Sequence, residues 1–154
     1  MQCIGFRYFN VFGARQDPDG PYAAVIPRWI RSLLHGDQVE IYGDGQTSRD
    51  FCYVQNVVQT NLLAALTNRT EALNQVYNIA VGERTSLDEL FVLLRDLLAS
   101  HGIPVQSSRA TYRDFRPGDV RHSEADISKA KRLLAYPVGT RWPRSSGHAG
   151  GSRP

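Results

Sequence analysis

Cysteine and histidine are scarce in this sequence, with only two cysteines and four histidines among 154 residues. Cys3 and Cys52 lie far apart, so a disulfide framework is not expected. The histidines show no clustered spacing with each other or with carboxylates, which a metal site would require. The sequence therefore predicts no metal and two buried thiols.

Long hydrophobic runs are missing as well. No apolar stretch approaches the roughly 18 residues of a membrane-spanning helix, and the first residues lack the basic start and the cleavage site of a signal peptide. We therefore expect a cytoplasmic protein with no membrane partner. A length of 154 residues with 42% hydrophobic content fits one domain with a real core.

The net charge of +3 comes from one end of the chain. Residues 140–154 carry Arg141, Arg144 and Arg153 but no acid, and the other 15 basic residues match the 15 acidic ones. A nucleic-acid-binding face would place its basic stripe on folded structure, so no nucleic-acid partner is expected. The glycine- and serine-rich residues 138–154 are predicted to form a disordered, aberrant tail behind a folded part at residues 1–137.

Strand and helix patterns alternate along residues 1–137, which favours an α/β architecture. Strands are expected at residues 3–9, 39–42, 49–54, 76–81 and 111–115, and helices at residues 23–34, 54–66, 87–101 and 126–134. Gly43-Asp44-Gly45 predicts a hairpin between residues 39–42 and 49–54. Ser86 and Glu89 form a capping-box pattern, and Asp126 is expected to cap the last helix.

Four polar residues border the predicted strands and suggest an anion site. Asn10 follows the first strand, where ligands bind in open α/β sheets, and the guanidinium groups of Arg49 and Arg116 suit phosphate oxygens. Asp119 could bridge the vicinal hydroxyls of a ribose. Each has an alternative explanation: Asn10 starts a turn, the arginines form surface ion pairs, and residues 116–119 form a type II turn. Together they would suit a nucleotide diphosphate.

Three motifs carry a resemblance to a known family: Arg7-Tyr8-Phe9-Asn10-Val11-Phe12-Gly13, residues 43–51 (GDGQTSRDF) and Arg116-Pro117-Gly118-Asp119-Val120-Arg121. They resemble the extended short-chain dehydrogenase/reductases of the NAD-dependent epimerase/dehydratase type, and among them bacterial UDP-N-acetylglucosamine 4-epimerases. The likeness runs from about Cys3 to Tyr136, with the motifs in the family's order. It implies the substrate-binding, C-terminal part of an extended Rossmann-type fold.

The resemblance also implies roles for individual residues. Asn10 would bond the diphosphate of a UDP-sugar, Arg49 and Arg116 would clamp it, Asp119 would hold the ribose and Ala24 would line the same pocket. The backbone at Glu40-Ile41-Tyr42 would meet the uracil, and Phe9 and Val11 would lie near the nicotinamide of NAD. Ser123 would adjoin the sugar, where its small side chain favours an N-acetyl group. From the residues alone, Ser123 equally suits the polar approach to the last helix.

Two features of the family are missing from this sequence. No glycine-rich dinucleotide-binding turn occurs, and none of the seven tyrosines has a lysine four residues later. By the resemblance, that tyrosine is the general base and NAD takes the hydride. No catalytic residue is therefore expected here, nor NAD binding by this chain alone. We interpret the chain as truncated before its first residue and diverted in reading frame near its end.

Three functions remain open at this point. The chain could be a fragment of a UDP-sugar 4-epimerase of nucleotide-sugar and surface polysaccharide biosynthesis, active only with a complementing cofactor-binding half. It could also be a non-catalytic nucleotide-sugar-binding module or an inactive remnant. Within the family, a nucleotide-sugar 4,6-dehydratase fragment shares the same scaffold. Strands 3–9 and 76–81 are expected to leave exposed edges, and the oligomeric state does not follow from the resemblance.

Overall fold

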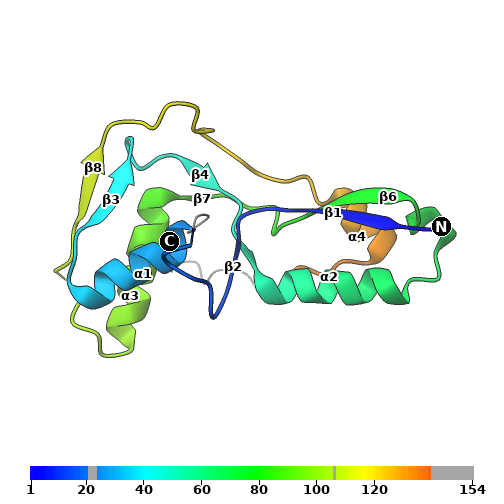
Figure 1. Cartoon of the computed structure of the whole chain (residues 1–154), viewed down its shortest axis with the longest axis horizontal. Coiled ribbons are helices and arrows are strands. Elements are labelled where there is room, and N and C mark those ends of the chain that lie inside the picture. The colour runs from blue at the N-terminus through cyan, green and yellow to red at the C-terminus, as the bar shows by residue number, and fades with distance from the viewer. Residues whose placement is uncertain (21–23, 106, 140–154) are drawn as a thin grey trace, which may run out of the picture.

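Parallel pairs of short strands, joined by long crossovers, organise the chain as an α/β protein (Figure 1). The computed structural model describes residues 1–20, 24–105 and 107–139. The parallel pairs are β1 (Ile4–Tyr8) with β6 (Gln75–Ile79), β2 (Val11–Phe12) with β5 (Cys52–Tyr53), and β3 (Val39–Tyr42) with β8 (Ala110–Arg113). One antiparallel pair joins β4 (Ser48–Arg49) to β7 (Thr85–Ser86). The predicted α/β class is confirmed.

The helices follow the apolar periodicity of the sequence. They are α1 (Val25–His35), α2 (Val54–Leu66), α3 (Leu87–Ser100), α4 (Ser128–Leu134) and a short 3-10 turn, η1 (Thr70–Ala72). Helix α1 ends at Gly36, whose φ of 76° lies in the left-handed region that glycine tolerates. The predicted capping box of α3 is present, with Ser86 and Glu89 each accepting from the other's backbone N–H. No helix of the described residues is long and apolar enough to cross a membrane.

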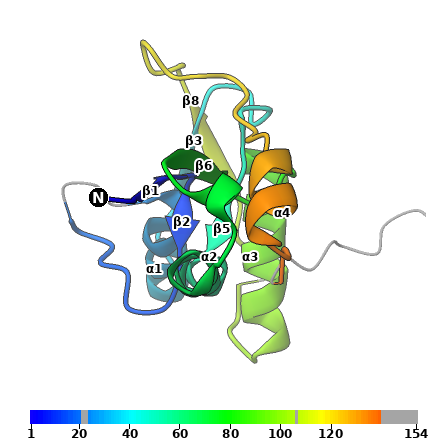
Figure 2. The ribbon, with the colours of Figure 1, turned by 90° about the vertical axis from the view of Figure 1, so that its right-hand side faces the viewer.

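Two hydrophobic clusters form the interior. The first packs α1 and α3 against β3, with Trp29, Leu33, Ile41, Leu90 and Leu94 buried. The second gathers around β6 and α4, where Tyr77 and Ile79 are fully buried. In Figure 1 the first cluster lies at the α1/α3 end of an elongated molecule and the second at the α2/α4 end, and Figure 2 views the molecule from the latter end. Strands β2, β4, β5 and β7 connect the two.

The predicted hairpin between residues 39–42 and 49–54 is wrong. Gly43 and Gly45 do make a local turn with φ values of 90° and 77°, but β3 pairs with β8 instead, and β4 and β5 pair with β7 and β2. The backbone N–H of Gly43 donates to the Arg113 carbonyl at 2.8 Å, which continues the β3–β8 pairing into the turn. Strand β8, about 70 residues further along the chain, therefore pairs with β3, where the turn residues alone would predict pairing with the segment that follows the turn.

Two smaller expectations also need correction. Cys52 is buried as predicted, but Cys3 is exposed, because it precedes β1 at the end of the sheet. The last helix begins one residue later than an Asp126 cap would give, since Ile127 occupies the N-cap position. The Asp126 carboxylate instead accepts from the backbone N–H of Ser128 at 2.8 Å, and bonds from Ser128 lower the pKa of Asp126. Of the tail predicted at residues 138–154, residues 140–154 lie outside the described residues.

Candidate functional site

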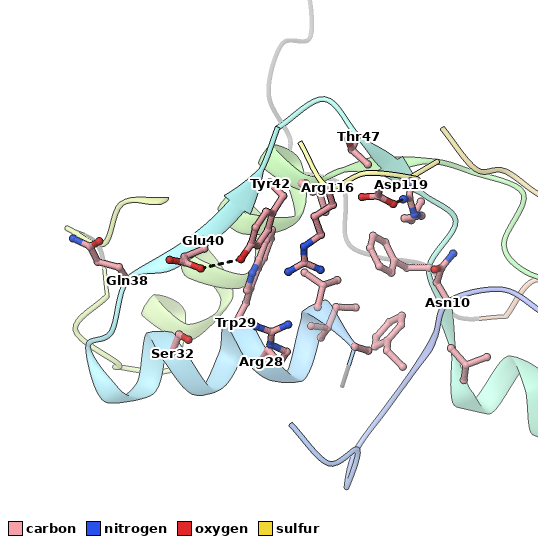
Figure 3. Close-up of a pocket in the computed structure, with 18 residues that line it drawn as sticks. Asn10, Arg28, Trp29, Ser32, Gln38, Glu40, Tyr42, Thr47, Arg116 and Asp119 are labelled. Carbon is pink, nitrogen blue, oxygen red and sulfur yellow. Dashed lines mark hydrogen bonds and ion pairs between the residues drawn. The ribbon is translucent and has the colours of Figure 1, made fainter. Parts of the chain in front are cut away.

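A cavity of about 450 Å³ opens where the β1–β2 junction faces α1 and β3. Its walls come from six parts of the chain: residues 10–12, the first two turns of α1, β3, the segment around β4, the start of α3, and the loop that follows β8 (Figure 3). Long-range strand pairing brings these segments together, because β3 and β8 carry residues 40–42 and 116–119 to the same end of their parallel pair. The cavity is therefore a product of the tertiary fold.

Asn10 lies at this cavity directly beyond β1. Its backbone φ of 34° is in the left-handed region, which asparagine tolerates better than most residues. Its side-chain amide donates to the Asp50 carbonyl at 3.1 Å, and its own carbonyl accepts from the Cys52 N–H at 3.3 Å. These bonds hold the exposed Asn10 side chain at the cavity wall.

Arg49 and Asp119 contact each other across the cavity wall. A guanidinium nitrogen of Arg49 donates to Oδ1 of Asp119, and another donates to the Ser48 carbonyl at 2.9 Å. The side chain of Arg49 is 18% exposed and that of Asp119 is 40% exposed. The ion pair therefore fixes the direction of Arg49 and offsets much of its charge.

Arg116 is held by an aromatic ring. Its guanidinium carbon lies 3.7 Å from the centroid of the Tyr42 ring, a cation–π contact. The Tyr42 hydroxyl donates to Glu40 at 3.3 Å, and Glu40 accepts from Arg113 at 2.7 and 3.0 Å. The bonds from Arg113 lower the pKa of Glu40. Glu40 is therefore a carboxylate at neutral pH, with Arg113 as its partner.

The loop that carries Arg116 and Asp119 has the predicted turn. The Asp119 N–H donates to the Arg116 carbonyl at 3.2 Å, and Gly118 has a φ of 79°, as the third position of a type II turn requires. The turn places Arg116 and Asp119 on the same cavity. Turn chemistry and a binding role are thus compatible at this tetrapeptide.

The sequence-predicted residues fall into two groups. Seven of them line the cavity: Asn10, Val11, Ala24, Tyr42, Arg49, Arg116 and Asp119. Phe9 and Ser123 are not among its lining residues. Phe9 packs against the second hydrophobic cluster, and the half-buried Ser123 donates its backbone N–H to the Ser48 carbonyl at 3.1 Å. The sugar and nicotinamide contacts assigned to Ser123 and Phe9 stay predictions.

Sequence reasoning missed Asp50, which supports the site from behind. Its carboxylate is fully buried and accepts from the backbone N–H groups of Val81 and Gly82 at 2.9 Å each and of Ala125 at 3.3 Å. Burial raises the pKa of Asp50, and the three N–H bonds oppose that shift. The signal in the sequence that could have indicated this buried carboxylate is the position of Asp50, directly before the apolar run that begins at Phe51.

Sequence reasoning also missed Arg28, a third arginine at the cavity, on the first turns of α1. Its exposed side chain shares the cavity with Arg49 and Arg116. Periodicity could have placed Arg28 off the apolar face of the helix, but not at the cavity. Among the described residues, no group of three or more His, Cys, Asp or Glu side chains is arranged to hold a metal ion.

The fold and the cavity together define an α/β protein with an arginine-lined pocket beyond the ends of parallel strands, the place where such folds bind anionic ligands. Residues 1–80 match the profile of the NAD dependent epimerase/dehydratase family. The chain belongs to this family, as the motifs of the sequence indicated. The predicted extended Rossmann-type relationship is confirmed by the solved structures that it resembles.

Three similar proteins show the extent of the match. A UDP-N-acetylglucosamine 4-epimerase of Methanobrevibacter ruminantium, solved with UDP-N-acetylmuramic acid, is 40% identical with a TM-score of 0.78 over 88% of this chain and 40% of its own. A UDP-glucose 4-epimerase of Thermotoga maritima, solved with UDP-glucose, is 37% identical with a TM-score of 0.80 over 92% of this chain and 42% of its own. A UDP-N-acetyl-alpha-D-glucosaminuronate decarboxylase of Bacillus cytotoxicus is 31% identical over 91% of this chain and 46% of its own. The chain therefore spans less than half the length of these relatives.

NAD is the cofactor of this family, and a UDP-glucuronic acid 4-epimerase of Bacillus cereus was solved with it. Of the two residues assigned to its nicotinamide, Val11 lines the cavity, and the partly buried Phe9 packs against the second hydrophobic cluster. In dinucleotide-binding folds the pyrophosphate lies on a glycine-rich turn at a helix N-terminus. Here α2 and α3 begin after Tyr53 and Ser86, and no such glycine-rich turn occurs in the sequence.

Proposed function

We propose that this chain is the UDP-sugar-binding part of an NAD-dependent UDP-sugar 4-epimerase. The observation that carries the proposal is the convergence of Asn10, Arg49, Arg116 and Asp119 on one cavity, from segments up to 109 residues apart in sequence. Family membership and relatives solved with UDP-sugars support the same ligand class. A nucleotide-sugar and surface polysaccharide pathway is the setting that we propose for the intact enzyme.

The proposed division of labour follows the chemistry of the side chains. Arg116 and Arg49 are the donors for the diphosphate, because guanidinium groups bind phosphate oxygens in pairs, and Asn10 adds an amide donor. Asp119 accepts from the ribose hydroxyls, for which it must share its bond with Arg49. The β3 backbone at Glu40 and Tyr42 faces the uracil. These groups bind and orient the ligand, and none of them is a base for the sugar hydroxyl.

The reaction itself is proposed to need a second segment. The sequence has no tyrosine followed by lysine four residues later, so it lacks the family's general base. A complementing half would supply that base and the NAD-binding turn. The same absence supports a second candidate function, a nucleotide-sugar-binding module that does no chemistry. The preference for an N-acetylated sugar rests on Ser123, and the decarboxylase among the relatives keeps other UDP-sugar reactions within the family open.

Isothermal titration of the purified chain with UDP-N-acetylglucosamine tests the proposal, with circular dichroism of the same sample to establish folding. Saturable binding that Arg116→Ala abolishes is the expected result. Arg84→Ala is the matched control. Arg84 forms an ion pair with Glu124, at an N–O distance of 3.1 Å, and neither residue lines the cavity. A folded chain that binds no UDP-sugar would refute the proposal, and an unfolded chain would refute binding by this chain alone.

A further inference from the structure

The charges of the cavity do not cancel. Five charged side chains line it: Arg28, Glu40, Arg49, Arg116 and Asp119. Asp119 pairs with Arg49, and Glu40 pairs with Arg113, which lies outside the lining. Two guanidinium groups, those of Arg28 and Arg116, remain without a carboxylate partner among the described residues. The cavity therefore presents two uncompensated positive charges.

Arg28 is the less constrained of these two cations. No hydrogen bond or ion pair holds its side chain within the described part of the chain, whereas Arg116 is stacked on Tyr42. The pKa of Glu40 is lowered mainly by Arg113 and least by Arg28, as expected for a guanidinium that is nearby but not in contact. In Figure 3, Arg28 projects from α1, while Arg116 comes from the opposite side of the cavity.

The position of Arg28 on α1 adds to the local positive potential. Arg28 is the fourth residue of the helix, whose first turn contains no acidic residue and whose N-cap, Ala24, has no capping side chain. The first N–H groups of a helix have no intrahelical acceptor and carry the positive end of its dipole. An anion in the cavity would therefore meet the helix terminus and Arg28 together.

We infer that Arg28 binds the diphosphate of the ligand and, with Arg116, supplies the two charges that balance it. This inference rests on the proposed function, and it adds a phosphate-binding residue to that site. A nucleoside diphosphate-sugar carries one negative charge on each phosphate, which matches the two uncompensated arginines. Arg49 then acts chiefly as a hydrogen-bond donor, since Asp119 already offsets its charge.

Titration of the full chain with UDP and with uridine separates a phosphate contact from a nucleoside contact. Arg28→Gln should weaken UDP binding about tenfold, the loss expected for one charge-assisted hydrogen bond, and leave uridine binding unchanged. Arg28→Lys keeps the positive charge but not the planar guanidinium, so it should lose less UDP affinity than Arg28→Gln. Arg31→Gln is the control, because Arg31 lies on the same helix but pairs with Asp19 outside the cavity lining.

The outcomes distinguish this inference from the function on which it rests. UDP binding by the wild-type chain with no loss in Arg28→Gln would overturn the role of Arg28 alone. Equal losses of UDP and uridine would also overturn it, because they would indicate a nucleoside or structural contact. A folded wild-type chain that binds neither UDP nor a UDP-sugar would refute the proposed function itself, and the role of Arg28 with it. Circular dichroism of each variant confirms that the fold is kept.

Discussion

Asp50 shows how one buried side chain can connect distant parts of a small protein. Its carboxylate binds backbone N–H groups at residues 81, 82 and 125, and the adjacent Arg49 reaches into the cavity. Removing the Asp50 carboxylate would take the acceptor away from all three N–H groups. Each buried N–H group that is left unpaired costs about 1–3 kcal/mol. Asp50 thus ties the end of β6 and the approach to α4 to the strand segment that carries the site.

The different burial of the two cysteines allows the second hydrophobic cluster to be tested by thiol labelling. Burial raises the pKa of the Cys52 thiol to about 11, and Cys3 is exposed. Because the thiolate is the reactive form, a thiol reagent at neutral pH should label one cysteine per native chain, at Cys3. Cys52 should react only after unfolding. Cys3→Ser is the control, since it should leave no fast-reacting thiol in the native protein.

The same shift predicts how stability depends on alkaline pH. The Cys52 pKa is raised from 9.0 in the unfolded chain to about 11 in the folded one, so the unfolded state loses its proton first. The contribution of Cys52 is therefore fully present below pH 9 and is lost as the pH rises toward 11. Urea unfolding across this range should show a decline that is smaller in Cys52→Ala. An equal decline in both proteins would contradict this assignment.

At the scale of elements, the N-terminus of α3 is fixed by local sequence. Ser86 Oγ accepts from the Glu89 N–H at 3.2 Å, and Glu89 accepts from the Ser86 N–H at 2.8 Å. Replacing an N-cap serine by alanine typically costs about 1 kcal/mol. Ser86→Ala should therefore lower the free energy of unfolding by about that amount, as measured by urea denaturation. Ser107→Ala, at an exposed position after the helix, should leave it nearly unchanged.

Local signals of this kind explain how much of the fold the sequence could predict. Helix α2 has the predicted bounds, and the α3 cap and the turn at Gly118 form as expected, because each depends on residues within a few positions of one another. Strand partners could not be predicted in this way. The pairing of β3 with β8 joins residues about 70 positions apart, and the Asp-Gly signal at residues 44–45 carries no information about that competitor.

In the candidate site, too, local motifs could be recognised from the sequence, whereas long-range contacts could not. Motifs in the sequence indicated Asn10, Arg49, Arg116 and Asp119, which all line the cavity. Neither the Arg49–Asp119 ion pair nor the stacking of Arg116 on Tyr42 could be predicted, because the partners lie 70 and 74 residues apart in the sequence. Arg28 was missed for a similar reason. Its place at the cavity depends on how α1 packs against β3.

At the scale of the whole molecule, one face of α2 is apolar and exposed. Val58, Leu62 and Leu66 recur every four residues along it and are 54%, 58% and 77% exposed. Tyr8 and Val76, on the neighbouring β1 and β6, are about half exposed. Single exposed apolar residues are normal, whereas larger contiguous apolar patches are typical of interaction surfaces. Since the chain spans less than half of its relatives, we propose that the complementing cofactor-binding half covers this row.

Leu62→Glu tests that proposal, because it places a charge in the middle of the row. Without a partner, the variant should form fewer aggregates than the wild-type chain in size-exclusion chromatography, since it removes exposed apolar surface. With a segment that carries the glycine-rich turn and the Tyr-x-x-x-Lys pattern, the variant should bind at least about tenfold more weakly, because burying a leucine side chain contributes about 2 kcal/mol. Ser107→Glu adds the same charge at an exposed position after α3, outside the row, and should behave as the wild-type chain. Equal complementation by Leu62→Glu and wild type would place the partner on another surface.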